Sequence, residues 1–168
     1  NNISKDKLRY GRLNDTFKVL NIDISTKIIY KLSDDYIKHL SSFNFLIDDT
    51  IQILKYLDSR YKLHIITNGF QEVQNLKLIN SGINHFFKTI TNSEMAGVKK
   101  PNQKIFQLAI NKARTDFDSS IMIGDNLDAD IHGALNSGMD AILFNYHKTN
   151  VPEGVVSIDK LIELRNIL

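Results

Sequence analysis

Apolar residues follow two different rhythms along this chain, one in residues 1–45 and another in the remainder. In the first part they recur at spacings of three and four, which is the period of one apolar helix face, so helices without strands are predicted there. The positions that carry this period are Tyr10, Leu13, Phe17 and Leu20, followed by Ile28 or Ile29, Leu32, Tyr36 and Leu40. Ser4, and Ser25 or Thr26, are suitable N-caps for two such helices.

From residue 46 onward, short runs rich in β-branched residues alternate with amphipathic stretches. The runs predict strands at 62–67, 88–91, 120–124 and 141–145, and the stretches predict helices at 49–57, 71–80, 101–113, 128–136 and 157–167. Gly82 and Gly138 stand where C-terminal caps belong, and Pro101 suits a first helical turn. This alternation predicts βα units and a mostly parallel sheet. We therefore expect an α/β protein with a helical module at residues 1–45 and an α/β core at residues 46–168.

Polar residues directly after the predicted strands are the first place to look for chemistry, because open α/β sheets bind ligands at the carboxyl ends of their strands. Thr67, Asn68 and Gly69 follow the first strand and lead into a helix. Such a turn offers a side-chain donor and backbone N–H groups to a phosphate oxygen. The same three residues are also ordinary turn chemistry, with Thr67 as a helix cap, so alone they leave both interpretations open.

Lys100 precedes Pro101 at the start of a predicted helix. A cation is unfavourable at the positive end of a helix dipole unless an anion lies nearby, so an acidic partner or a phosphoryl group is expected there. A solvated surface lysine is the alternative, and the neighbouring Lys99 fits that description better.

Three carboxylates, Asp125, Asp128 and Asp130, follow another strand within six residues. They repel one another unless a cation or hydrogen bonds compensate. Mg2+ would suit them, because it takes few carboxylates and leaves positions for water and a substrate phosphate. Helix capping is the alternative and fits Asp128, whereas Asp125 stands too early to cap and is the best metal candidate. Asp130 is expected to bind through water or to organise the site.

Taken together, "IITNGF" (65–70), "VKKP" (98–101) and "IGDNLDAD" (123–130) resemble three motifs of the haloacid dehalogenase (HAD) superfamily. Much of the remaining chain is similar to the pyrimidine 5'-nucleotidase-like subgroup with a small helical cap. The resemblance implies a Rossmann-like core, a cap inserted after the first core strand, Mg2+ and an aspartyl-phosphate intermediate. It also implies that Thr67 and Asn68 hold the phosphoryl group, that Lys100 neutralises it, and that Asp125 and Asp130 support the metal.

The motif that supplies the nucleophile in this family, a strand ending in Asp-x-Asp-x-Thr, is absent from the chain. "FLIDDT" (45–50) resembles it superficially, but Leu46 would occupy the nucleophile position, and leucine cannot attack phosphorus. Asp48, Asp49 and Thr50 are better interpreted as the start of a helix. We therefore expect the first core strand and its aspartates to lie upstream of Asn1. The expected activity is Mg2+-dependent phosphomonoester hydrolysis, with nucleoside 5'-monophosphates among the candidate substrates.

Two alternatives belong beside this expectation. A haloacid dehalogenase would share the fold and the aspartate nucleophile but has no use for magnesium. A noncatalytic remnant would keep the residues that bind phosphate and metal but would catalyse no reaction. Because the resemblance puts the missing strand in the middle of the sheet, a truncated chain would have exposed strand edges, and we would expect it to be unstable or to form a strand-swapped oligomer.

Composition and charge narrow the classes of partner. The chain has 168 residues, a net charge of +2 and no cysteine, which excludes disulfides, thiolate catalysis and cysteine-held zinc. The lysines are spread along the chain, so a nucleic-acid polymer is not expected as a partner. No apolar run approaches the roughly 18 residues that a membrane span requires, and no signal-peptide layout is present. A small phosphorylated substrate and a cytoplasmic location are the default expectations.

Overall fold

The computed structural model describes residues 4–168 and divides into two units, which meet in sequence between Asn44 and Phe45. The predicted boundary between cap and core stands one residue later, after residue 45. Residues 1–3 of the predicted cap lie outside the described residues.

The first unit consists of two helices, α1 (Lys5–Val19) and α2 (Thr26–Ser42), as the apolar period predicted. The predicted N-cap at Ser4 is confirmed, because its hydroxyl accepts a hydrogen bond from the Lys7 N–H at 3.3 Å. The helices pack against each other, with the rings of Tyr10 and Tyr30 4.8 Å apart. Of the recurring apolar positions only Ile29 is buried, while Leu20, Leu32 and Tyr36 are exposed, so the period predicted the helices but not the face through which they pack.

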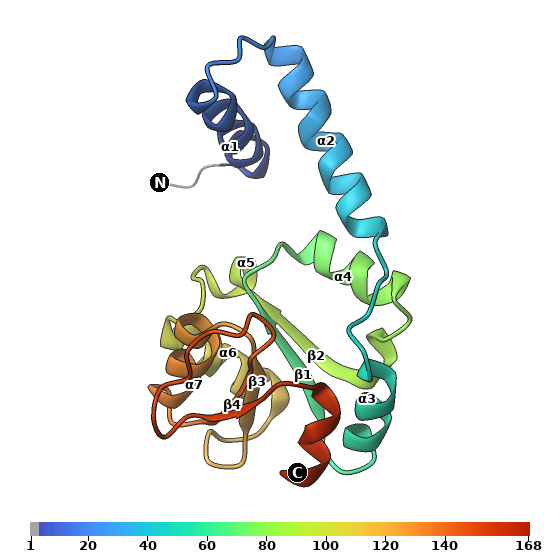
Figure 1. The fold of residues 1–168 in the computed structure, drawn as a ribbon, viewed down its shortest axis with the longest axis vertical. Coiled ribbons are helices and arrows are strands. Elements are labelled where there is room, and N and C mark those ends of the chain that lie inside the picture. Colours follow the sequence, from blue (N-terminus) through green and yellow to red (C-terminus); the bar gives the residue numbers. More distant parts are fainter. Residues whose placement is uncertain (1–3) are drawn as a thin grey trace. The chain divides into compact units, whose positions relative to one another are not determined.

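The second unit alternates helices and strands (Figure 1). In chain order its elements are α3 (Thr50–Asp58), β1 (Leu63–Thr67), α4 (Gln71–Asn80), η1 (Asn84–Phe86), β2 (Phe87–Asn92), α5 (Ser93–Ala96), α6 (Gln103–Ala113), β3 (Ile121–Gly124), η2 (Leu127–His132), α7 (Gly133–Leu135), β4 (Asp140–Phe144), β5 (Val156–Ile158) and η3 (Leu161–Asn166). The segment η2 is a single turn of π-helix, and η1 and η3 are 3-10 helices. The α/β class expected from the sequence is confirmed.

All strand pairs of this unit are parallel, but they form two separate sheets. β1 pairs with β2, so that Thr67 lies opposite Asn92 at their carboxyl ends. β4 pairs with β3 on one side and with β5 on the other, and Gly124 lies opposite Leu143. Within residues 4–168 no backbone pairing joins β1 to β3. The sheet that the sequence predicts is therefore present as two halves.

Helices cover both faces of these half-sheets, and two apolar clusters fill the space between. One cluster lies under α3 and η3; it contains Ile53, Leu57, Ile142, Phe144, Ile158 and Leu164, with Leu63 and Ile123 packed against it. The other lies under α6 and α7; it contains Ile105, Phe106, Ile110, Met122, Ala134 and Met139, with Ile66 packed against it. Because residues of β1 and β3 contribute to both clusters, the halves share their cores although their backbones are unpaired.

Two details of the sequence interpretation are wrong. The predicted helix at 157–167 is instead β5 followed by the 3-10 turn η3, because Val156–Ile158 pairs with β4. Helix α6 starts at Gln103 after an Asn102 cap, so Pro101 precedes the helix instead of opening it. The Lys100–Pro101 peptide bond is cis.

The expected C-terminal caps Gly82 and Gly138 both have positive φ, which confirms their positions. None of the helices described in residues 4–168 has both the length and the apolar character that crossing a bilayer would require.

Candidate active site

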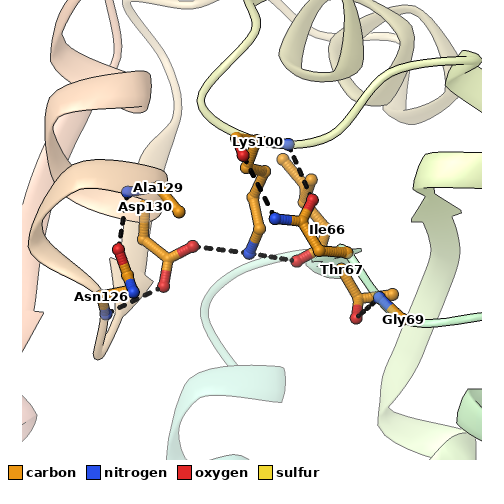
Figure 2. Close-up of polar contacts among 8 residues, drawn as sticks. Ile66, Thr67, Gly69, Lys100, Asn126, Ala129 and Asp130 are labelled. Carbon is orange, nitrogen blue, oxygen red and sulfur yellow. Dashed lines mark hydrogen bonds and ion pairs between the residues drawn. The ribbon is translucent and has the colours of Figure 1, made fainter. Parts of the chain in front are cut away.

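A buried ion pair forms the centre of the candidate site. The Lys100 ammonium lies 2.6 Å from Oδ1 of Asp130, and the two side chains are only 10% and 6% exposed. The same ammonium donates to the carbonyl oxygen of Ile66 in β1 at 2.8 Å (Figure 2). Lys100 therefore links the end of one half-sheet to the segment that follows the other. Its burial rules out the alternative of a solvated surface lysine, and Asp130 is the acidic partner that the sequence led us to expect.

The backbone on either side of Lys100 is held by Asn68. The Asn68 side chain accepts from the Lys100 N–H at 2.7 Å and donates to the Lys100 carbonyl at 3.2 Å. The Ser93 hydroxyl donates to the Asn68 carbonyl at 3.2 Å. Both ends of the Asn68 amide are thus engaged with the backbone of another loop. The Nδ2 group has a second hydrogen to donate, so the contact of Asn68 with a phosphoryl group stays a prediction.

Thr67 presents its hydroxyl at the carboxyl end of β1. Its Oγ1 accepts a hydrogen bond from the Gly69 N–H at 3.0 Å, which fixes the turn into α4. A hydroxyl that accepts in this way keeps its own hydrogen to donate. A Cβ at Gly69 would meet the end of the Gln74 side chain, which would have to move aside. The geometry supports Thr67 as a donor to an anionic oxygen.

Asp130 reaches the site because the chain packs tightly after β3. A Cβ at Gly124 would lie 2.4 Å from Oδ2 of Asp130, so only glycine leaves room for this carboxylate. The backbone N–H of Asn126 donates to the same oxygen at 3.2 Å. The Asn126 side chain accepts from the Ala129 N–H at 2.7 Å and is the cap of η2. A π-turn is common at functional sites, and here it directs Asp130 toward Lys100.

The sequence interpretation gave the capping role to Asp128, and this was wrong. Asn126 caps the turn, and Asp128 instead lies 3.2 Å from Nδ1 of His132, four residues further along. Both residues of that pair are exposed. Asp128 therefore belongs to the surface of η2, outside the group around Lys100.

Asp125 lies in a more open environment than Asp130. Its side chain is 54% exposed, and its Oδ2 lies 3.2 Å from Nε2 of His147. A cavity of about 300 Å3 opens beside it, lined by Ile47, Ile123, Gly124, Asp125, Phe144, Tyr146 and Leu161. Apart from Asp125 and the Tyr146 hydroxyl this lining is apolar. Asp125 is consequently a carboxylate at the rim of a cavity, with one oxygen already engaged.

The donor set around Asp125 and Asp130 can be compared with what Mg2+ requires. No group of three or more His, Asp or Glu side chains with metal-binding proximity occurs among residues 4–168. Mg2+, however, is usually held by one or two carboxylates together with water and substrate phosphates. The open Asp125 therefore fits a metal ligand, whereas each oxygen of Asp130 already has a partner within the protein, either Lys100 or the Asn126 N–H.

The two half-sheets and the residues at their carboxyl ends define a Rossmann-like α/β protein with a candidate phosphate site. A family model of the haloacid dehalogenase-like hydrolases matches residues 5–144. The chain belongs to the haloacid dehalogenase-like hydrolase family, as the motifs implied.

Two relatives and one solved structure give the family context. The chain is 30% identical to pyrimidine 5'-nucleotidase YjjG of Escherichia coli, over 99% of the chain and 73% of that protein. It is 37% identical to a glyceraldehyde 3-phosphate phosphatase of Methanothermobacter thermautotrophicus, over 64% of the chain and 51% of that protein. The magnesium-bound crystal structure of the HAD-hydrolase YfnB of Bacillus subtilis is similar with a TM-score of 0.86 and 28% identity, over 99% of the chain and 73% of YfnB.

Sequence reasoning missed two residues of this region. Asn126 lies within the motif "IGDNLDAD", and its side chain accepts a hydrogen bond from the N–H of the residue three positions later. Asparagine is a preferred N-cap, so its position just before the predicted helix was a recognisable signal. His147 lies three residues after β4, which is paired with β3. Because ligands bind at the carboxyl ends of parallel strands, the residues after β4 should have been considered together with Asp125.

Proposed function

We propose that this chain is the phosphate- and metal-binding part of a Mg2+-dependent phosphomonoester hydrolase. The observation that carries the proposal is the placement of the Lys100 ammonium between the ends of β1 and β3, with the Thr67 hydroxyl and the Asp125 carboxylate at the same edges. A donor, a buried cation and an open carboxylate are the groups that phosphoryl transfer requires for positioning and charge stabilisation.

The nucleophile in this proposal is an aspartate on a strand upstream of residue 1, which pairs with β1 and β3. Support comes from the edges of these two strands, which among residues 4–168 pair only with β2 and β4 respectively. Strand edges next to a shared apolar core are normally covered, because unpaired backbone groups there are unfavourable. A parallel strand between them would end beside Lys100 and Asp125, where an attacking carboxylate is needed.

Each residue then has a defined task in the proposed reaction. A carboxylate oxygen of the upstream aspartate attacks phosphorus while the ester P–O bond breaks, and the leaving oxygen takes a proton from the second aspartate of the Asp-x-Asp-x-Thr motif and departs as an alcohol. Water, which gives a proton back to the second aspartate, then hydrolyses the aspartyl-phosphate to inorganic phosphate and the free carboxylate. The Thr67 hydroxyl donates to a phosphoryl oxygen, and the Lys100 ammonium offsets negative charge on the nucleophile and the phosphoryl group. Bound Mg2+ would supply further charge neutralisation at the phosphate oxygens. Asp125 would hold it, and Asp130 keeps Lys100 in place.

The substrate class within the proposal is a small phosphomonoester, with nucleoside 5'-monophosphates as the first candidates. Similarity to YjjG, a pyrimidine 5'-nucleotidase, over nearly the whole chain supports this choice. Similarity to a glyceraldehyde 3-phosphate phosphatase over a shorter stretch makes that compound the natural competitor in an assay.

The test is phosphate release by the full-length protein from a pyrimidine nucleoside 5'-monophosphate and from glyceraldehyde 3-phosphate, with Mg2+ and with EDTA. We expect Mg2+-dependent release that Lys100→Met abolishes and that Lys99→Met, a change at the exposed neighbouring lysine, leaves intact. Equal activity in EDTA would contradict the proposed metal. Halide release from a 2-haloacid without phosphate release would favour the dehalogenase alternative, and absence of both would favour a noncatalytic remnant.

A further inference from the structure

A second residue at the carboxyl edge of the sheet engages the proposed metal ligand. Nε2 of His147 lies 3.2 Å from Oδ2 of Asp125, although the two residues are 22 positions apart in sequence. They come together because β3 and β4 are adjacent and parallel, so the residues that follow each strand meet at one edge. An ionised carboxylate only accepts hydrogen bonds, so Nε2 carries the hydrogen and donates it.

The loop that carries His147 is fixed by several interactions of its own. The Asn145 side chain donates to the Thr149 carbonyl at 3.0 Å and accepts from the Thr149 N–H at 2.9 Å, which closes the loop on itself. Lys148 forms an ion pair with Asp159 at 2.9 Å, which ties the loop to the segment after β5. The hydrogen bonds between Asn145 and Thr149 therefore define the backbone around residue 147, while the exposed Lys148–Asp159 pair adds little.

The ring of His147 is supported as well. The Tyr146 ring meets it edge-on at 5.3 Å, and Tyr146 in turn lies 5.7 Å from the Phe144 ring in the apolar core. Such aromatic contacts restrict the orientations that an otherwise exposed imidazole can adopt. The imidazole is thus attached to the core through a neighbour, even though 61% of its surface is exposed.

Fold stability does not account for this arrangement. Both members of the pair are more than half exposed, and exposed pairs contribute little, between about 0 and 1 kcal/mol. What the pair does determine is the orientation of the Asp125 carboxylate, because one oxygen is engaged and the other is left available. Carboxylates that bind metals are commonly oriented in this way by an outer hydrogen-bond donor.

We propose that His147 is a positioning residue for metal binding, which holds Oδ2 of Asp125 and leaves Oδ1 available for Mg2+. This inference rests on the proposed function, since it assumes that Asp125 is a metal ligand. It adds a residue from the loop after β4 to a site otherwise built from motifs near β1, α6 and β3. Removing an outer donor of this kind typically weakens metal binding by about 10- to 100-fold.

The experiment measures Mn2+ binding to the full-length protein without substrate, by electron paramagnetic resonance of the free ion, with Mg2+ as competitor. We expect His147→Ala to raise the metal Kd by about 10- to 100-fold. His147→Gln should restore most of the affinity, because its Nε2 can donate from a similar position. His132→Ala is the matched control, since His132 forms an exposed pair with Asp128 at the same distance of 3.2 Å and should leave the Kd unchanged. Thermal unfolding of each variant separates metal affinity from loss of fold.

The outcomes separate this inference from the function on which it rests. If the unmodified protein binds no metal, the proposed Mg2+ site and this role of His147 both fail. If the unmodified protein binds metal and His147→Ala binds it equally well, only the role of His147 is refuted. Tighter binding by His147→Ala would also refute it, because His147 would then compete with the cation for Asp125. Weaker binding that His147→Gln does not restore would point to the ring contacts instead of the donor.

Discussion

Replacing Asp130 with asparagine tests the buried ion pair at the centre of the site. The change keeps the shape of the side chain but leaves the Lys100 ammonium, 10% exposed, without the anionic partner that it has among residues 4–168. At 2.6 Å and an effective dielectric constant of about 20, the lost Coulomb attraction is about 6 kcal/mol. In the folded protein, the cost of removing both charged groups from water offsets part of this attraction. Removing one member of a buried pair typically costs about 3–5 kcal/mol, and we expect Asp130→Asn to lower the free energy of unfolding by that amount.

Urea unfolding with linear extrapolation measures this loss, and the chain offers a matched control. Lys88 and Asp58 form an exposed pair at 3.4 Å, with side chains 52% and 34% exposed. Asp58→Asn should therefore cost less than about 1 kcal/mol. The double variant Lys100→Met with Asp130→Asn should recover part of the loss, because no unpaired charge is left buried. The reasoning is refuted if Asp130→Asn is no more destabilising than Asp58→Asn.

Three further predictions concern other parts of the core unit. Gly124→Ala places a Cβ against the Asp130 carboxylate and should cost about 1–3 kcal/mol of stability in urea unfolding, together with most of the phosphatase activity. Thr67→Val should lower kcat/KM about 100-fold while Thr67→Ser, which keeps the hydroxyl, stays within a few-fold in steady-state kinetics. Burial and two nearby lysines hold the pKa of His64 below its ordinary value of 6.5. The unfolded chain therefore binds more protons, so stability should fall as pH drops below about 6.5, and His64→Gln should reduce this fall in urea unfolding at several pH values.

Local pattern was sufficient for most helices of the fold. Helix α4 has the bounds 71–80 that its apolar period and flanking turn residues predicted. The C-terminal segment differed because its structure depends on a distant partner. Val156–Ile158 becomes a strand by pairing with β4, and neither its composition nor its period reveals which edge is open to it.

The candidate site was likewise predictable from the sequence only in part. The residue types after β1 and β3 were predictable, because parallel strands place their carboxyl ends together and phosphate chemistry requires hydroxyls, cations and carboxylates there. The hydrogen-bond partners of these residues were not predictable from the sequence. The Asn68 amide bonds to the backbone of Lys100, and this depends on the approach of two loops that are 32 residues apart. Such contacts depend on tertiary packing and leave no local signature.

The division of the sheet into two halves has a consequence for hydrogen exchange. Amides of β1 and β3 that face β2 and β4 lie in hydrogen-bonded ladders, whereas those on the opposite edges have no ladder partner within residues 4–168. Alternate amides along β1 and β3 should therefore exchange at very different rates in this chain. Pairing with an additional strand would slow the exchange of the unpaired set, so exchange along these short strands reports directly on whether a strand occupies the space between the two half-sheets.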